Sequence, residues 1–141
     1  MLRSRAKLPT HSKERMSDHL LLDTHVVLWW RANDTRLTLT AREAIAAASL
    51  VYVSAASAWE IAIKSSLGRV RLPQSFAEGT QQSGFIELPI SFQHAQAVEF
   101  LPSHHADPFD RMLLAQAKVE RLVIVTHDRR FEPYGQAIIW T

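Results

Sequence analysis

Short apolar segments alternate with segments of helical periodicity along nearly the whole chain. Runs of leucine, valine and isoleucine predict strands over residues 19–23, 50–53, 85–88, 122–125 and 137–140. Apolar spacing and capping signals predict helices over 26–30, 40–48 (with a capping box at 40–43), 55–67, 73–84, 91–101 and 108–119. Strands that are separated by helices favour a parallel sheet. The alternation therefore predicts an α/β fold with helices on both faces of the sheet.

Length and composition exclude several classes of protein. A chain of 141 residues fits one domain. Without cysteine it forms neither a disulfide scaffold nor a cysteine zinc site. The longest apolar run, Val26–Trp30, is far shorter than the roughly 20 residues that span a bilayer, and no secretory signal is visible. We therefore expect a cytoplasmic protein that does not bind a membrane.

The excess of positive charge is concentrated at the N-terminus. Residues 1–15 have a net charge of +4 and the remaining residues sum to −2. A basic chain often indicates a nucleic-acid partner, but here the signal comes from a short segment without hydrophobic periodicity. We expect residues 1–18 to be a flexible basic extension and residues 19–141 to be the folded domain.

Four acidic residues occupy equivalent places in this scheme. Asp23 ends the first strand, and Glu60 lies near the start of the helix after the second. Asp110 lies in the first turn of the helix that begins at residue 108, and Asp128 follows the fourth strand. In open parallel sheets, ligands bind outside the carboxyl ends of the strands. We therefore expect these four side chains to share one pocket.

Several carboxylates in one pocket need a cation. Two of them about 5 Å apart repel each other by roughly 3 kcal/mol at an effective dielectric constant near 20. An oxygen-only ligand set favours Mg²⁺ or Mn²⁺ over zinc. Carboxylate-bound Mg²⁺ activates a water molecule and stabilises the leaving oxygen of a phosphodiester. The pattern therefore indicates hydrolysis of nucleic acid.

Each acid also has a purely structural explanation that stays open at this point. Glu60 has capping-box spacing from Ser57, and Asp110 would suit the dipole of its helix in any case. Asp128 could close a turn, and Asp23 could cap the following helix. The joint placement of the four acids is what favours a site.

Four stretches containing these acids resemble PIN-domain ribonucleases, specifically VapC-type toxins of bacterial type II toxin–antitoxin systems. They are residues 20–30 (LLLDTHVVLWW), 54–64 (SAASAWEIAIK), 107–117 (DPFDRMLLAQA) and 122–131 (LVIVTHDRRF), in the order of the family. The resemblance covers the chain from about Leu20 to the C-terminus. It implies a three-layer α/β/α sandwich with a central, mainly parallel sheet. It also implies Mg²⁺-dependent endonucleolytic cleavage of RNA, with Mn²⁺ as a substitute, a cognate antitoxin as inhibitor, and a homodimer.

The resemblance also implies roles for single residues. Asp23 and Asp110 match metal ligands of the family. Glu60 matches an acid that contacts the metal or positions the attacking water, and Asp128 matches a more variable acid that acts through water. Asp107 matches a motif residue that is not counted as catalytic, and we expect it to be a helix N-cap. Residues 1–15 have no counterpart in the family pattern.

The histidines do not have the spacing of a metal motif. His104 and His105 are adjacent, so their side chains point apart, and we expect both to be loop residues. His25 and His127 lie beside candidate ligands; they could tune the pocket, but packing or solvent exposure is the expected role.

Several cationic and aromatic side chains also lie near the predicted pocket. Lys64 is expected to form an ion pair with Glu60 on one helix face. Two roles, binding of RNA phosphate and a solvated surface charge, remain open for Arg111, Arg129 and Arg130. Core or interface positions, rather than base stacking, are expected for Trp29, Trp30, Trp59 and Trp140.

The sequence leads us to a metal-dependent endoribonuclease as the first hypothesis. The alternative from another class is a non-catalytic RNA-binding or partner-binding module on the same fold. A third hypothesis is a DNA-directed or phosphoesterase activity at the same site, because a fold does not determine its substrate.

Overall fold

The structure is a computed structural model that describes residues 18–141, so the predicted basic extension over 1–18 lies outside the described residues except for Asp18. The elements, in chain order, are β1 (His19–Leu22), α2 (Thr24–Ala32), α3 (Leu39–Ala47), β2 (Leu50–Ser54), α4 (Ala55–Ser66), α5 (Phe76–Gln82), β3 (Ile86–Leu88), α6 (Phe92–Glu99), α7 (Pro108–Glu120), β4 (Val123–Thr126), the 3-10 helix η1 (Arg129–Tyr134) and β5 (Ile138–Trp140). Within these residues, no helix combines the length and the apolar character needed to cross a membrane.

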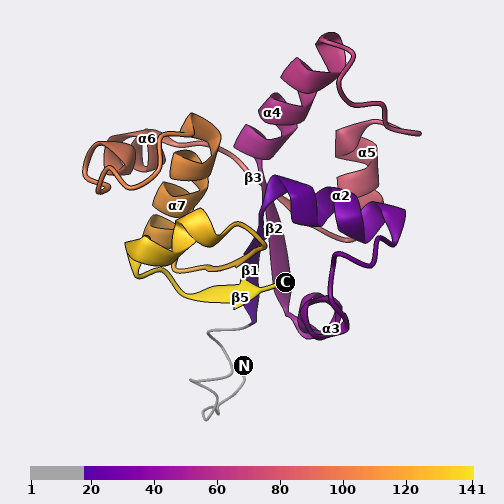
Figure 1. The fold of residues 1–141 in the computed structure, drawn as a ribbon, viewed down its shortest axis with the longest axis horizontal. Coiled ribbons are helices and arrows are strands. Elements are labelled where there is room, and N and C mark those ends of the chain that lie inside the picture. The colour runs from indigo at the N-terminus through magenta and orange to yellow at the C-terminus, as the bar shows by residue number, and fades with distance from the viewer. Residues whose placement is uncertain (1–17) are drawn as a thin grey trace, which may run out of the picture.

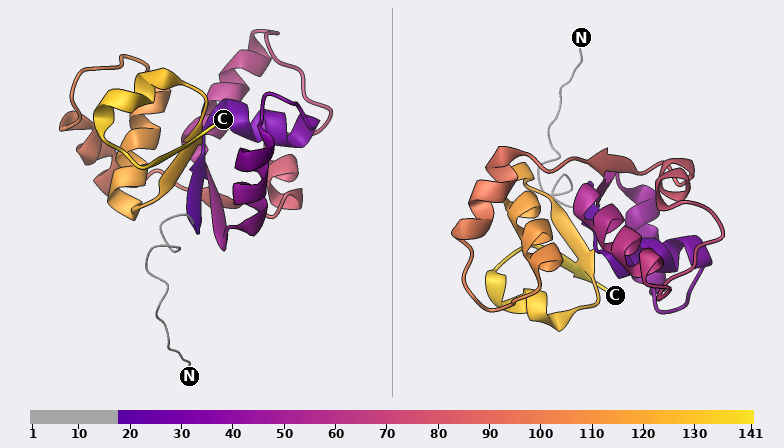
Figure 2. Two further views of the ribbon diagram at one scale, coloured as in Figure 1. Left: turned by 60° about the horizontal axis from the view of Figure 1, so that its bottom comes forward. Right: turned by 90° about the horizontal axis from the view of Figure 1, so that it is seen from above.

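The strands form one five-stranded sheet with the order β3-β2-β1-β4-β5, and every neighbouring pair is parallel. Helices α2, α3 and α5 lie on one side of the strands, and α6 and α7 lie on the other (Figure 1). Figure 2 shows the same separation into two helical layers from two further directions. The predicted α/β class, with a parallel sheet between helices, is confirmed.

Side chains of the central strands alternate between two cores, one on each face of the sheet. Leu20 and Leu22 pack against α2 and α3, whereas Leu21 packs against α7. In β4, Val123 and Val125 join the first core and Ile124 joins the second. A strand buried on both faces has an uninterrupted apolar sequence, which explains why β1 and β4 were recognisable as strands.

Most helix boundaries agree with the capping signals, but three starts were predicted wrongly. Helix α2 begins at Thr24 rather than at residue 26. Helix α3 is capped by Thr38, whose hydroxyl accepts from the Ala41 N–H at 3.2 Å, so the predicted capping box at Thr40 lies inside the helix. The backbone N–H of Thr38 donates to the Thr141 hydroxyl, and local sequence patterns do not predict a contact between residues 103 positions apart. Helix α5 begins after Ser75 rather than at Pro73, because Ser75 accepts from the N–H of Glu78.

Arg111 has a structural role that neither of its two predicted roles describes. Its guanidinium lies between α7 and the chain that follows α6, where it donates at 2.8–3.4 Å to the carbonyl oxygens of Val98, Leu101, Pro102 and His105. One cation thus binds three backbone acceptors of the loop that follows α6 and one, Val98, in the last turn of α6. Arg111 therefore fixes the loop that leads into α7.

We expect Arg111→Met to lower the free energy of unfolding by about 1–3 kcal/mol, because the loop carbonyls lose a charged donor. Amide hydrogen exchange over residues 100–107 should accelerate more than exchange elsewhere. Urea denaturation and exchange measured by mass spectrometry test this, with the exposed Lys118→Met on the same helix as control. Equal stability and equal exchange for the two variants would contradict the structural role of Arg111.

Candidate active site

The carboxyl end of the sheet carries all four predicted acids. Asp23 directly follows β1 and occupies the N-cap position of α2, and Asp128 follows β4 and caps η1. Glu60 lies on α4, which begins where β2 ends, and Asp110 lies in the first turn of α7. In Figure 1, α2 and α4 begin at the upper end of the strands, with α7 beside them. The structure therefore brings together acids that are up to 105 residues apart in the sequence.

Thr126 joins Asp23 to Asp128. Its hydroxyl donates to Asp23 Oδ2 at 2.6 Å and accepts from the backbone N–H of Asp128 at 3.0 Å. Asp23 is only 5% exposed, and within the described residues its side chain makes no hydrogen bond that caps α2. The capping explanation for Asp23 is therefore wrong.

Glu60 is held by groups from two helices. Thr24 Oγ1 lies 2.9 Å from Glu60 Oε1 and 2.7 Å from the hydroxyl of Ser57. A carboxylate only accepts, so the Thr24 proton points to Glu60 and the Ser57 hydroxyl donates to Thr24. The predicted ion pair with Lys64 is confirmed, at 3.1 Å from Nζ to Oε2. Because the N-cap of α4 is Ser54, the capping-box explanation for Glu60 and Ser57 is wrong.

Asp107 caps α7, as predicted, and leaves Asp110 free for other contacts. The Asp107 carboxylate accepts from the backbone N–H groups of Phe109 at 2.8 Å and of Asp110 at 3.2 Å. The Asp110 side chain instead accepts from His105 Nε2 at 2.7 Å. Asp110 does lie in the first helical turn, but its carboxylate contacts the neighbouring loop.

His105 belongs to the acidic group, which sequence reasoning missed. It lies in a loop, as predicted, but it is only 6% exposed, and its Nε2 lies 3.9 Å from Asp128 Oδ2 as well as 2.7 Å from Asp110. Its Nδ1 accepts from the Asp107 N–H at 3.4 Å, so Nε2 is the donor toward Asp110. The ring of His104 packs against Tyr134 instead. The two adjacent histidines do point apart, and one of them points into the site.

Asp128 both stabilises a turn and belongs to the cluster of four acids at the end of the sheet. Its Oδ1 accepts from the Arg130 N–H at 3.0 Å, and the Arg130 guanidinium binds Oδ2 at 2.8 Å. These contacts hold the pKa of Asp128 below its usual value, and the largest cause is the side-chain hydrogen bond from Arg130. The turn explanation for Asp128 is therefore correct, and it coexists with the contact to the other acids.

Burial, together with repulsion between the acids, changes how two of them bind protons. Burial raises the pKa of Asp110 to about 8, and the charges of Asp23, Asp107, Asp128 and Glu60 contribute further. Burial also raises the pKa of Asp23. Asp110 therefore retains its proton at neutral pH, and a divalent cation would remove the charge excess that its ionisation creates.

The donors at this end of the sheet fit a divalent cation. Three potential ligand atoms, one from each of His105, Asp110 and Asp128, lie within 4.8 Å of one another. The carboxylate donors suit Mg²⁺ and Mn²⁺, whereas the imidazole of His105 would suit a transition metal ion. Asp23 stands outside this three-residue group and is connected to it through Thr126 and Asp128.

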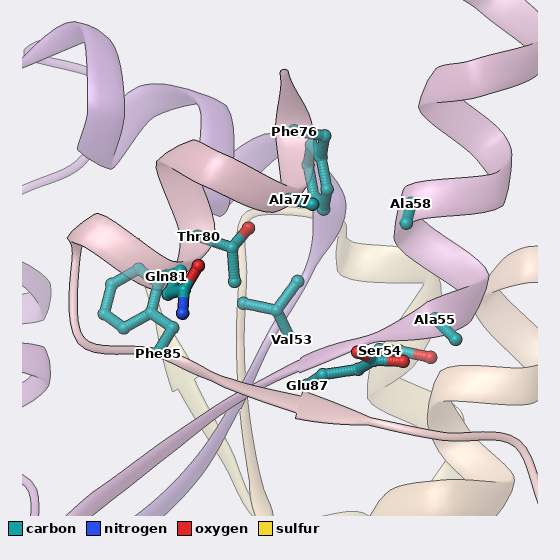
Figure 3. Close-up of a pocket in the computed structure, with 10 residues that line it drawn as sticks. All are labelled: Val53, Ser54, Ala55, Ala58, Phe76, Ala77, Thr80, Gln81, Phe85 and Glu87. Atoms are coloured by element: carbon teal, nitrogen blue, oxygen red, sulfur yellow. The ribbon is translucent and has the colours of Figure 1, made fainter. Parts of the chain in front are cut away.

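Two cavities differ in their relation to the acids. A cavity of about 380 Å³ is lined by both Asp23 and Asp128. A second cavity, of about 520 Å³, lies between α4, α5 and the edge strand β3, and its carboxylate belongs to Glu87 (Figure 3). None of the four predicted acids lines this larger cavity. The larger of the two cavities is therefore not the candidate active site.

Comparisons with known proteins agree with this architecture. Over 122 residues the chain is 33% identical to Ribonuclease VapC22 of Mycobacterium tuberculosis, an alignment that covers 82% of this chain and 91% of that protein. Its fold is similar to chains of two solved complexes: DNA-bound VapBC of Salmonella typhimurium (TM-score 0.65, 22% identity, 86% of this chain and 96% of that one), and VapBC2 of Rickettsia felis bound to a promoter fragment (TM-score 0.65, 12% identity, 85% and 96%).

The family model for the PIN domain matches residues 20–136, which include all four acids and His105. This match and the similarity to VapC22 confirm the resemblance inferred from the four motifs. The chain belongs to the PIN domain family.

Proposed function

We propose that this protein is a divalent-metal-dependent endoribonuclease and the toxin of a toxin–antitoxin pair. The observation that carries the proposal is the convergence of Asp23, Glu60, Asp110 and Asp128 at one end of the sheet, in a chain 33% identical to a VapC ribonuclease. The charge excess of this group supports a need for a metal ion. We further propose that the ion is Mg²⁺, with Mn²⁺ as a substitute.

The proposed metal ligands are Asp23 and Asp110, and His105 and Asp128 lie close enough to assist. When bound, the ion would supply Lewis-acid stabilisation of the phosphodiester and a water molecule of lowered pKa. Asp23 is held in one orientation by the Thr126 hydroxyl, and Asp110 by His105. Such fixed carboxylates lose little further conformational entropy when they bind a ligand.

Glu60 is proposed to orient the attacking water and to accept its proton. One Glu60 oxygen accepts from Thr24 and the other from Lys64. A carboxylate has about four acceptor positions, so these two hydrogen bonds leave room for water. Asp128 is proposed to act through water, since Arg130 already occupies part of its carboxylate.

A cognate antitoxin and a second copy of the chain are the proposed protein partners. The solved complexes of similar fold are described as VapBC or toxin–antitoxin complexes. Large apolar side chains are exposed at Trp59 (61%), Phe92 (90%) and Phe100 (79%), which is typical of surfaces that bind other proteins. Of the two positions predicted for Trp59, core or interface, its 61% exposure excludes the core and leaves the interface; its ring meets Phe109 edge-on.

The alternative functions are separated by their response to metal ions. A non-catalytic binding module would retain RNA without cleaving it, whatever divalent ion is added. A DNA-directed nuclease or general phosphoesterase would need the same ion but would prefer a different substrate. Incubation of purified protein with RNA, single-stranded DNA and a small phosphodiester, with and without Mg²⁺, distinguishes the three.

Asp23→Asn should reduce RNA cleavage by at least about 100-fold, because a neutral amide is a poor ligand for a hard cation. EDTA should stop cleavage by the wild type, and added Mg²⁺ or Mn²⁺ should restore it. Gel assays on a structured RNA measure both effects, and circular dichroism checks the fold. Glu87→Gln, a carboxylate-to-amide change in the other cavity, is the matched control. Full activity of Asp23→Asn would refute the proposed site.

Metal-free protein should lose stability from Asp110 as pH rises. The pKa of Asp110 is raised to about 8 in the folded state, whereas an unfolded chain has the ordinary value of 3.8. Between these values only the folded state retains the proton, so this residue opposes folding increasingly as pH rises. In EDTA at pH 8, Asp110→Asn should therefore be more stable than the wild type by at least about 1 kcal/mol, or about 4 °C in Tm.

The advantage of Asp110→Asn should disappear near pH 4 and should be reduced by added Mg²⁺. Thermal melts at several pH values, with and without the ion, measure this. Asp34→Asn is a control of opposite sign, because Arg36 lowers the pKa of Asp34 to about 2. That variant should be less stable than the wild type at pH 7, and the difference should vanish as pH falls through 2. A pH-independent effect of Asp110→Asn would contradict the prediction.

A further inference from the structure

The cavity of about 380 Å³ beside the acids has a second wall of a different chemical character. Asp23 and Asp128 form its acidic side. The other lining side chains are all aromatic or cationic: His25, Trp29, Arg36, His127 and Arg129. The cavity therefore joins the proposed metal ligands directly to a basic, aromatic surface.

Trp29 organises this surface from below. It is only 8% exposed, so it is the floor of the cavity rather than a free stacking platform. The His25 ring stacks on it at 6.1 Å between centroids, and the His127 ring meets it edge-on at 5.6 Å. The Arg36 guanidinium lies 5.1 Å from the centre of the indole. One buried indole thus positions three exposed polar side chains around it.

Three side chains of the cavity lining, His127, Arg36 and Arg129, have contacts away from Trp29 that fix them before any ligand binds. His127 Nδ1 donates to the Thr141 carbonyl oxygen at 2.8 Å, which leaves Nε2 as its free nitrogen. Arg36 forms two hydrogen bonds with the Asp34 carboxylate, at 2.7 and 3.1 Å. The Arg129 guanidinium lies 4.2 Å from the centre of the Trp140 ring. Groups ordered in this way lose less entropy on binding.

The charges identify the group that would bind a phosphate. Arg36 is neutralised by Asp34, and Arg130, outside the cavity lining, is neutralised by Asp128. Within the described residues, Arg129 forms no ion pair with a carboxylate, because it lies over the indole of Trp140 instead. Arg129 therefore keeps its full charge, next to Asp128, for an anion that enters the cavity.

Single-stranded RNA has the chemistry that suits this cavity. Unpaired bases stack on histidine rings and arginine planes, and phosphates pair with arginine. A volume of about 380 Å³ lies within the range of small-molecule sites and accommodates one nucleotide. An acidic protein segment would use the arginine but would leave the imidazole surface without a partner.

We propose that this cavity is the subsite for the nucleotide that adjoins the scissile phosphate, with its base on His25 and its phosphate on Arg129. The proposal rests on the nuclease function inferred above. His127 and Arg36 close the sides of the subsite, and Trp29 keeps them in place.

The first test measures binding without cleavage. A 5′-fluorescein-labelled, mixed-sequence 12-nucleotide RNA is titrated in EDTA at fixed salt, and the fluorescence anisotropy gives Kd. The double variant His25→Ala, Arg129→Ala should raise Kd at least about tenfold. Arg42→Ala is the matched control, because it removes an arginine that lies over a different indole, that of Trp30, outside the cavity. Equal Kd values for the double variant and the wild type would overturn the subsite.

The second test separates the subsite from the nuclease proposal. With Mg²⁺, the ratio of kcat/KM for RNA to kcat/KM for bis(p-nitrophenyl) phosphate, a diester without a base, should fall at least about tenfold in the double variant. An unchanged ratio would overturn the subsite and leave the nuclease function standing. RNA that binds at the cavity in EDTA but is never cleaved with Mg²⁺ would support the cavity as an RNA-binding site and defeat the nuclease function. Loss of affinity for a polyglutamate peptide, with RNA binding unchanged, would overturn the subsite in favour of an acidic protein partner.

Discussion

The structure depends on holding several negative charges together at the end of a buried sheet. Burial, with their mutual repulsion as a further cause, raises the pKa of Asp110 to about 8, so the metal-free site opposes folding at neutral pH. The two apolar cores that enclose β1 and β4 on both faces offset this cost. Asp23 and Asp128 follow these two strands, and α4 and α7 bring Glu60 and Asp110 to the same end of the sheet. A divalent cation bound to these carboxylates would relieve the repulsion between them.

Hydroxyl groups organise the site as much as charges do. Thr126 connects Asp23 to the backbone of Asp128, and Thr24 connects Ser57 to Glu60. Both threonines are nearly fully buried, so their hydroxyls would be costly without partners. Each threonine orients a carboxylate without adding charge.

The sequence predicted those parts of the fold and site that depend on local chemistry. Apolar runs marked the strands, and Asp107 and Ser91 marked helix starts, because capping involves residues only two or three positions apart. The predictions failed where a distant partner decides the outcome. The Thr141 hydroxyl accepts a hydrogen bond from the backbone of Thr38, and Arg111 donates to carbonyl oxygens of the loop after α6. His105 could be recognised as part of the site only after the loop had been placed beside Asp128.

The distribution of cations among the acids bears on which of them bind metal. Lys64 pairs with Glu60 and Arg130 pairs with Asp128, at the periphery of the group. Within residues 18–141, no lysine or arginine forms an ion pair with Asp23 or Asp110, and these are the two acids whose pKa burial raises. A carboxylate without a permanent counter-ion has the most to gain from a divalent cation. This asymmetry supports Asp23 and Asp110 as the proposed ligands, and it assigns Glu60 and Asp128, whose charges are already balanced, to the handling of water.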